Sequence, residues 1–384
     1  MPVRAVKRPR VDAAAPIDRQ HVRFAEWARD EHGIYINGVT PAQLPNRGVG
    51  LVADKKLRSG DTLIRVGPES MIRPDLKHYG PDAQVSPQAK LVLELLRLHS
   101  DGDDTYKRCA ATWPDRQVFQ DCLFWYGCRQ HQDREFWDGK LQPSLFAMYT
   151  RLRDDFDVDD LAIKASSSDY EKKPTEDDIM YYWTIANTRS FAWKSAGQKE
   201  GVMVMCPFLD FMNHCPAGEG CTVKVGDDGF TLVADRDYNI NEEILGTYGA
   251  HSNDKLLVHY GFTVPNSADD SISLDSAIMP NLTISQKHDL EAVGFLGNYS
   301  LTPSTNEICF RTQVALRARR QTSNEWEFFM NCGDDIGVDV EDSICRDLHR
   351  FISVDRKDRP GPLALCQSQK RVLKELNAVR SKLP

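Results

Sequence analysis

The sequence lacks the features that would place it in a membrane or hold it together by disulfides. No apolar run in its 384 residues approaches the roughly 20 residues needed to span a bilayer. The first ten residues, MPVRAVKRPR, are too polar for a secretory signal. The 10 cysteines contain no C-x-x-C pair. We therefore expect no membrane segment, reduced thiols packed as small hydrophobic groups, and no metal site.

The composition is that of a globular protein. Hydrophobic residues make up 41% and charged residues 27% of a chain long enough for two or three domains. The net charge of −8 disfavours general nucleic-acid binding and suits a basic, lysine-rich protein partner. We find no internal repeat.

The chain alternates between strand-like and helix-like stretches. Residues 1–17 are basic and rich in alanine, which predicts a disordered tail, with KRPR as an alternative nuclear-localisation patch. A helix over 21–31 ends at Gly33, and Gly48 and Gly50 bracket a tight turn before strands at 51–53 and 62–66.

Residues 86–190 show helical periodicity. We expect helices over 87–99 and over 176–188, the second with Thr175 as its N-cap. Strands return at 202–206, 221–225 and 230–234, and Gly-Asp-Asp-Gly at 226–229 predicts a hairpin turn. A linker leads into a strand at 271–274, and residues 280–384 again have a helical pattern. This order of elements predicts an α+β fold.

Polar side chains are concentrated at two points in the apolar stretch 205–262. Asp210, Asn213 and His214 follow a hydrophobic run, and Tyr248 comes about 35 residues later. Polar and phenol groups in such surroundings indicate that distant segments converge on one site.

Four motifs in this order resemble those of a known family. They are GVGL at 48–51, RSF at 189–191, DFMNH at 210–214 and EEILGTYG at 242–249. Together they resemble the SET domain of the Rubisco large-subunit methyltransferase-like class. The resemblance implies a SET β-fold over 18–263, split by a helical insert at about 85–180. A mainly helical substrate-binding domain over 264–384 follows.

The resemblance also implies an S-adenosyl-L-methionine (AdoMet)-dependent protein-lysine N-methyltransferase. In that class Arg189 pairs with the AdoMet carboxylate, while the Asn213 side chain and the His214 main chain hold its methionine and adenine ends. Asp210 shapes the lysine entry or braces a turn. The implied site residues are Tyr248 for catalysis; Arg47, Gly48, Val49, Arg189, Asn213, His214 and Phe262 for AdoMet; and Phe191, Asp210 and Tyr260 for the substrate.

The reaction requires a neutral lysine, because an ammonium has no lone pair. A narrow apolar channel and the neighbouring sulfonium both lower the pKa of a lysine, so no strong base is needed. Oxygen atoms around the methyl orient it through weak C–H···O contacts. An aromatic ring at Phe191 suits the alkyl chain of a lysine.

Two other functions stay open at this point. The first is a protein-histidine methyltransferase, although the actin-modifying branch tends to carry a polar amide where this chain has Phe191. The second is an adaptor that keeps the fold to bind a peptide. The zinc-binding tail of histone-type enzymes is absent, which favours a non-histone substrate such as a ribosomal or translation protein. We expect a monomer in the cytoplasm, the nucleus or both, without a nucleic-acid or membrane partner.

Overall fold

The structure is a computed structural model of the whole chain. It describes residues 17–45, 47–75, 85–130, 141, 143–168, 170, 173–195, 201–265, 267–302, 307–336, 340, 344, 346 and 347. The tail expected at 1–17 falls almost entirely outside them, and residues 348–384, part of the region expected to be helical, also lie outside them. The described residues form two compact units, one from 17–125 and 153–250, the other from 126–152 and 251–347.

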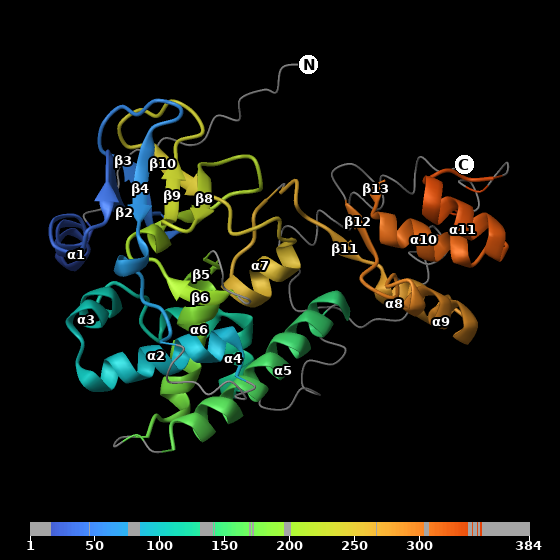
Figure 1. The fold of residues 1–384 in the computed structure, drawn as a ribbon, viewed down its shortest axis with the longest axis horizontal. Helices are drawn as coiled ribbons and strands as arrows, with labels where there is room; N and C mark the ends of the chain where they lie inside the picture. The colour runs from blue at the N-terminus through green and yellow to red at the C-terminus, as the bar shows by residue number, and fades with distance from the viewer. Residues whose placement is uncertain are drawn as a thin grey trace. The chain divides into compact units, whose positions relative to one another are not determined.

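Two four-stranded sheets form the β part of the first unit (Figure 1). One has the order β2-β3-β10-β7 and the other the order β1-β4-β9-β8. Their strands are β1 (Tyr35–Ile36), β2 (Val39–Leu44), β3 (Gly48–Ala53), β4 (Thr62–Val66), β7 (Asn213–His214), β8 (Thr222–Gly226), β9 (Gly229–Val233) and β10 (Glu243–Gly246). Leu51, Leu63 and Ile64 are fully buried in them.

The glycines of the first motif are placed differently from our expectation. Gly48 pairs with Leu44 at the end of the β2–β3 hairpin, and Gly50 lies inside β3 opposite Ala42. The turn therefore precedes Gly48, whose φ of 68° suits glycine, and the prediction of a turn between the two glycines is wrong. The hairpin turn at 226–229 is confirmed, since Gly226 pairs with Gly229.

Two helices of the first unit begin directly after a capping residue. α1 (Arg19–Asp30) starts after Asp18, which accepts from the backbone N–H of Gln20. Thr175 and Asp178 form a capping box at the start of the second expected helix. That helix is α6 (Glu176–Arg189), and the other helices between β4 and β7 are α2 (Pro87–Asp101), α3 (Asp104–Ala110), α4 (Leu123–Gln130) and α5 (Pro143–Ser166).

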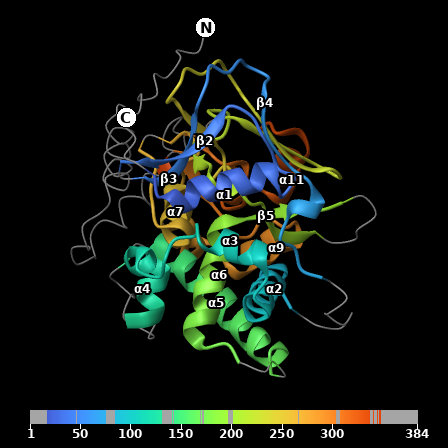
Figure 2. The same cartoon turned by 90° about the vertical axis from the view of Figure 1, so that its left-hand side faces the viewer.

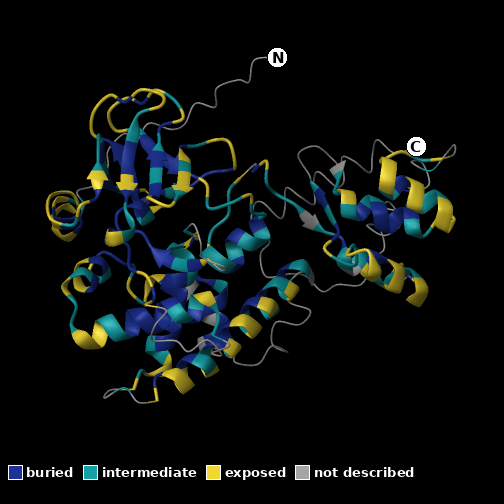
Figure 3. Ribbon diagram, viewed as in Figure 1, coloured by how far each residue is buried: buried dark blue, intermediate teal, exposed yellow. Residues whose placement is uncertain are grey.

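Helices α2, α3 and α6 lie together beside a small two-stranded sheet (Figure 2). That sheet consists of β5 (Ser190–Trp193) and β6 (Val202–Met205), and β6 packs on α2. The faces that meet are buried, as the dark ribbon segments show (Figure 3). Trp183 of α6 is buried and donates its indole N–H to Asp159 at 2.9 Å. Aromatic side chains of the helical stretch are thus part of the buried core.

The second unit contains both helices and a three-stranded sheet. Its sheet has the order β11-β12-β13, and β11 falls on the strand that we expected at 271–274. Strands β12 and β13 interrupt the region after residue 280 that we expected to be helical. Its elements are α7 (Asn253–Tyr260), β11 (Ile272–Ser273), α8 (Asp275–Ile278), α9 (Ile284–Ala292), β12 (Ser300–Thr302), β13 (Glu307–Ile308), α10 (Phe310–Ala318) and α11 (Ser323–Cys332). Strands this short are hidden from sequence periodicity, which needs four or more residues.

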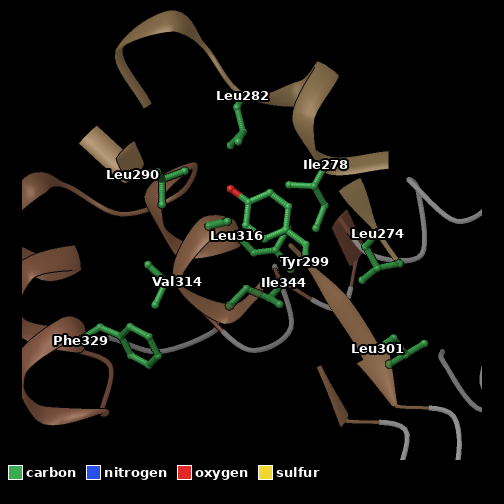
Figure 4. Close-up of a cluster of buried hydrophobic side chains, with 11 residues drawn as sticks. Leu274, Ile278, Leu282, Leu290, Tyr299, Leu301, Val314, Leu316, Phe329 and Ile344 are labelled. Atoms are coloured by element: carbon green, nitrogen blue, oxygen red, sulfur yellow. The ribbon is translucent and has the colours of Figure 1, made fainter. Parts of the chain in front are cut away.

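The core of this unit gathers side chains from helices and strands alike. Ile278, Leu282 and Leu316 lie around the ring of Tyr299, which comes from the stretch just before β12 (Figure 4). Burial of such side chains contributes about 1.5–3 kcal/mol each. The eight described cysteines of the chain are free thiols, and no described helix is long and apolar enough to cross a membrane.

The histidine of α7 makes the second unit sensitive to acid. Burial, together with the positive charges of Lys255 and His251, lowers the pKa of His259 from 6.5 to about 4. The unfolded chain therefore takes up a proton as the pH falls below 6.5, while the folded chain does not. Stability is lost as the pH falls from about 6.5 to about 4, by about 2 kcal/mol at pH 5.

We expect His259→Gln to remove most of this acid-dependent loss. Urea unfolding at pH 7.5 and pH 5.0 gives the change in the free energy of unfolding between the two pH values. This change is compared between wild type and variant. The exposed His288 of α9 supplies the control, His288→Gln. An equal loss in wild type and His259→Gln would contradict the assignment.

Candidate active site

The parallel pairing of β7 with β10 brings three of the four motifs together. Leu245 lies opposite Asn213 and Gly246 opposite His214. On its other side β10 runs antiparallel to β3, with Ile244 opposite Leu51. The segments around residues 50, 213 and 245 are therefore neighbouring strands of one sheet, although nearly 200 residues separate the first from the last. The predicted convergence of distant segments holds for these three motifs.

Tyr248 follows β10 and is held at two points by the segment that carries Asn213. Its backbone N–H donates to Nδ1 of His214 at 3.1 Å, and its hydroxyl donates to the carbonyl of Met212 at 2.8 Å. The two rings lie 5.1 Å apart. Because Nδ1 of His214 accepts a hydrogen bond, it carries no proton, and a neutral ring has its proton on Nε2. This contact fixes the backbone that bears Tyr248.

A buried carboxylate, which the sequence analysis did not single out, ties the first motif to the third. Glu243 accepts from Nη1 of Arg47 at 2.5 Å and from Nδ2 of Asn213 at 3.1 Å. Its side chain is 8% exposed, against 40% for Arg47. The sequence pattern that could have identified Glu243 is an acidic residue at the start of an apolar strand, Glu-Ile-Leu-Gly. In the structure every residue of that strand is buried.

The glycines of this sheet leave room for that contact. A Cβ on Gly50 would lie 2.6 Å from Nδ2 of Asn213 and 2.4 Å from Leu44. A Cβ on Gly246 would lie 2.3 Å from the sulfur of Met212, the residue whose carbonyl binds Tyr248. By contrast, nothing lies within 4 Å of a Cβ on Gly48. The first and fourth motifs thus need glycine for close packing at two positions.

Arg189 and Asp210 form a second, separate polar contact. Nη1 of Arg189 donates to the Asp210 carboxylate at 3.0 Å and to the Asp210 carbonyl at 3.3 Å. The two side chains are 17% and 5% exposed. Burial raises the pKa of Asp210, and the Arg189 guanidinium opposes that rise. Asp210 thus binds Arg189; the role of Arg189 toward AdoMet stays a prediction.

The remaining substrate and cofactor residues lie in different parts of the chain. Val49 is half-buried in β3, and Phe191 is half-buried in β5, where its ring lies 5.4 Å from that of Phe230. Tyr260 and Phe262 belong to the second unit, with ring centroids 6.1 Å apart. Their expected roles, that of Tyr260 toward the substrate and that of Phe262 toward AdoMet, stay predictions.

A metal centre is not apparent in the described part of the chain, where no group of three His, Cys, Asp or Glu side chains has the geometry to hold an ion. The chemistry available is that of the phenol, the amide, the guanidinium groups and the backbone. Such groups bind and orient charged or polar ligands, and the phenol oxygen can in addition accept a weak hydrogen bond.

Gly50→Ala tests the packing of this sheet. The added methyl meets Leu44 and the Asn213 amide, both held in the interior, so we expect a loss of about 1–3 kcal/mol in the free energy of unfolding. Gly67→Ala is the control, because its methyl meets only the exposed side chain of Glu69, which can move away. Urea unfolding of the three proteins measures both effects, and equal stability of the two variants would contradict this account.

Comparison with known proteins agrees with the geometry. The family model of the SET domain matches residues 48–249, more than half of the chain. Ribosomal lysine N-methyltransferase set11 of Schizosaccharomyces pombe is 31% identical over 137 residues, which cover 35% of this chain and 34% of set11. SET domain-containing protein 4 of Mus musculus is 26% identical over 388 residues, covering 86% of this chain and 81% of that protein.

The fold is also similar to a solved structure, that of Rubisco LSMT bound to AdoMet. The TM-score is 0.63 at 15% sequence identity, over 96% of this chain and 90% of that one. The match to set11 spans about a third of that relative, whereas the matches to SET domain-containing protein 4 and to Rubisco LSMT extend over most of both chains. The chain belongs to the SET-domain family.

Proposed function

We propose that this protein transfers a methyl group from AdoMet to the ε-amino group of a lysine in a protein substrate. The observation that carries the proposal is the placement of Tyr248. In a SET-family domain, its hydroxyl is bound to the Met212 carbonyl and its backbone to His214, beside the Asn213–Glu243–Arg47 cluster.

The residues of the cluster fit AdoMet by their chemistry. The methionine end of AdoMet carries a carboxylate and an ammonium, and a guanidinium and an amide oxygen are their natural partners. Gly48 leaves open space where a side chain would stand, which suits close approach of a ligand to the backbone. Arg47, the backbone at Gly48 and Val49, Asn213 and the His214 backbone would hold it, together with Arg189. When bound, AdoMet supplies a sulfonium methyl.

The contacts of Tyr248 indicate what its phenol does. The hydroxyl proton of Tyr248 is donated to the Met212 carbonyl, so the phenol is neutral and its oxygen is too weak a base to take a proton from lysine. The lone pairs of that oxygen can still accept weak hydrogen bonds. Those lone pairs suit C–H···O contacts with a polarised methyl group. The role that we assign to Tyr248 is therefore to orient the methyl for in-line attack, an effect of position rather than of proton transfer.

The proposal assigns the loss of the lysine proton to desolvation. An apolar channel lowers the pKa of a lysine, and the adjacent positive charge lowers it further. Phe191, packed on Phe230, offers an apolar surface for the alkyl chain. Asp210 is paired with Arg189, which leaves it a poor candidate for a base.

The substrate is proposed from the relatives. The name of set11 describes it as a ribosomal lysine N-methyltransferase, so a ribosomal or translation protein is our first choice. Such proteins are basic, which suits a chain of net charge −8. We place the reaction where such substrates occur, in the cytoplasm or the nucleus.

Tyr248→Phe tests the proposal directly. Incubation of wild type and variant with methyl-labelled AdoMet and a proteome lysate, followed by mass spectrometry, locates the modified residue. We expect one labelled lysine, and a loss of about 100-fold in rate in the variant because the oxygen that orients the methyl is gone.

Tyr181→Phe is the matched control. Its hydroxyl also donates to a backbone carbonyl, that of Pro114 at 3.0 Å, but it lies in α6, two turns before Arg189. We expect this variant to keep the wild-type rate. Label on histidine would support the actin-type alternative, and AdoMet binding without any labelled protein would support the adaptor.

Phe191→Asn tests the apolar surface for lysine. A polar amide at this position costs desolvation against the alkyl chain, and we expect kcat/KM for the lysine substrate to fall about 10-fold. Ala192→Asn places the same amide on the exposed neighbour in β5 and serves as the control. An unchanged rate in Phe191→Asn would remove Phe191 from the channel.

A further inference from the structure

Glu243 is a charged side chain in a strand whose every residue is buried. β10 runs Glu-Ile-Leu-Gly between β3 and β7, and the Glu243 side chain is 8% exposed. A buried carboxylate costs free energy unless charge and hydrogen bonds offset the loss of water. Here Arg47 supplies the opposite charge at 2.5 Å, and Asn213 supplies a second donor at 3.1 Å. A hydrophobic residue at position 243 would serve equally well to form the strand. Glu243 in addition links two segments that are distant in the sequence, through Arg47 and Asn213.

The chemistry of the contact fixes which way the Asn213 amide faces. A carboxylate only accepts hydrogen bonds, so the NH2 group of Asn213 must point at Glu243. The amide oxygen is then turned away from Glu243 and is available to accept from a donor. The fixed face of Asn213 is therefore an acceptor, which suits an ammonium and not a carboxylate.

Gly50 is the third element of the arrangement. It lies in β3 opposite Ala42, and a Cβ there would stand 2.6 Å from Nδ2 of Asn213 and 3.4 Å from Oε1 of Glu243. The absence of a side chain at Gly50 thus makes room for the hydrogen bond between the other two residues. Strand β3 and the loop before it contribute both the space and, through Arg47, the counter-charge.

We propose that Glu243 is a positioning residue for the methionine end of AdoMet. It acts through Asn213, whose oxygen it presents to the α-ammonium, and it holds Arg47 and the first-motif turn in place. This inference rests on the proposed function, because it takes AdoMet as the ligand of the Asn213 segment.

The test is Glu243→Gln, measured by calorimetric binding of two ligands. S-adenosylhomocysteine has the amino-acid end, whereas 5′-methylthioadenosine has the adenosine part without it. Glutamine keeps the shape but loses the charge, so the orientation of Asn213 and the tie to Arg47 are no longer imposed. We expect binding of S-adenosylhomocysteine to weaken about 10-fold or more, and binding of 5′-methylthioadenosine to change less than about twofold.

The neighbouring Glu242→Gln is the matched control. Glu242 also accepts from an arginine, Arg236 at 2.8 Å, but in a pair apart from Asn213. We expect it to bind both ligands as the wild type does. A second check is Glu243→Gln in an Asn213→Ala background, where the part of the effect that acts through Asn213 is gone and the added loss should be smaller than in the wild-type background.

Each outcome bears on the inference separately from the proposed function. Equal weakening of both ligands would show a general structural role and overturn the inference, as would unchanged binding of S-adenosylhomocysteine. If Glu243→Gln does not fold, Glu243→Asp withdraws the carboxylate by one methylene, and the same selective loss is expected. A wild-type protein that binds neither ligand would contradict the proposed function itself.

Discussion

The parallel pairing of β7 with β10 is the contact on which the site depends. Two residues of each strand take part, and they set Asn213 beside Leu245 and His214 beside Gly246. Parallel neighbours need a long crossover connection, and here residues 215–242 supply it. That connection contains the β8–β9 hairpin, which joins the other four-stranded sheet. The chain thus leaves the first sheet after β7, forms two strands of the second sheet, and returns to the first sheet as β10. Tyr248 follows the end of β10.

The buried charges of the first unit are compensated in two different ways. Glu243 accepts hydrogen bonds from two residues far apart in the sequence, Arg47 and Asn213. It thereby links the segments on both sides of β10. The Asp210 carboxylate binds Arg189, and Asp210 lies one turn before Asn213. The first arrangement fixes the orientation of the Asn213 amide, whereas the second fixes the end of α6 to the start of the third motif. Both offset the cost of burying a carboxylate.

Much of the fold was predictable from the sequence because local signals and tertiary packing agree. Thr175 before three acidic residues predicted the start of α6, and the Gly-Asp-Asp-Gly turn predicted the β8–β9 hairpin. The resemblance named the motifs around Asn213 and Tyr248. What escaped was set by partners distant in the chain. In the sequence Glu243 is an ordinary acidic residue, because nothing local indicates that Arg47 faces it. The pairing of Arg189 with Asp210 is likewise visible only in the structure.

The long separation between Arg47 and Glu243 has a consequence for how the chain reaches this structure. The two residues are 196 positions apart, so the β2–β3 hairpin is synthesised long before its neighbour β10 exists. Until then β3 has an open edge with unpaired N–H and C=O groups, which is a template for association with other chains. Closure of so large a loop is slow. In a ribosome-bound chain shorter than about 245 residues this edge of β3 has no β10 to pair with, so it is open to association with other chains during synthesis.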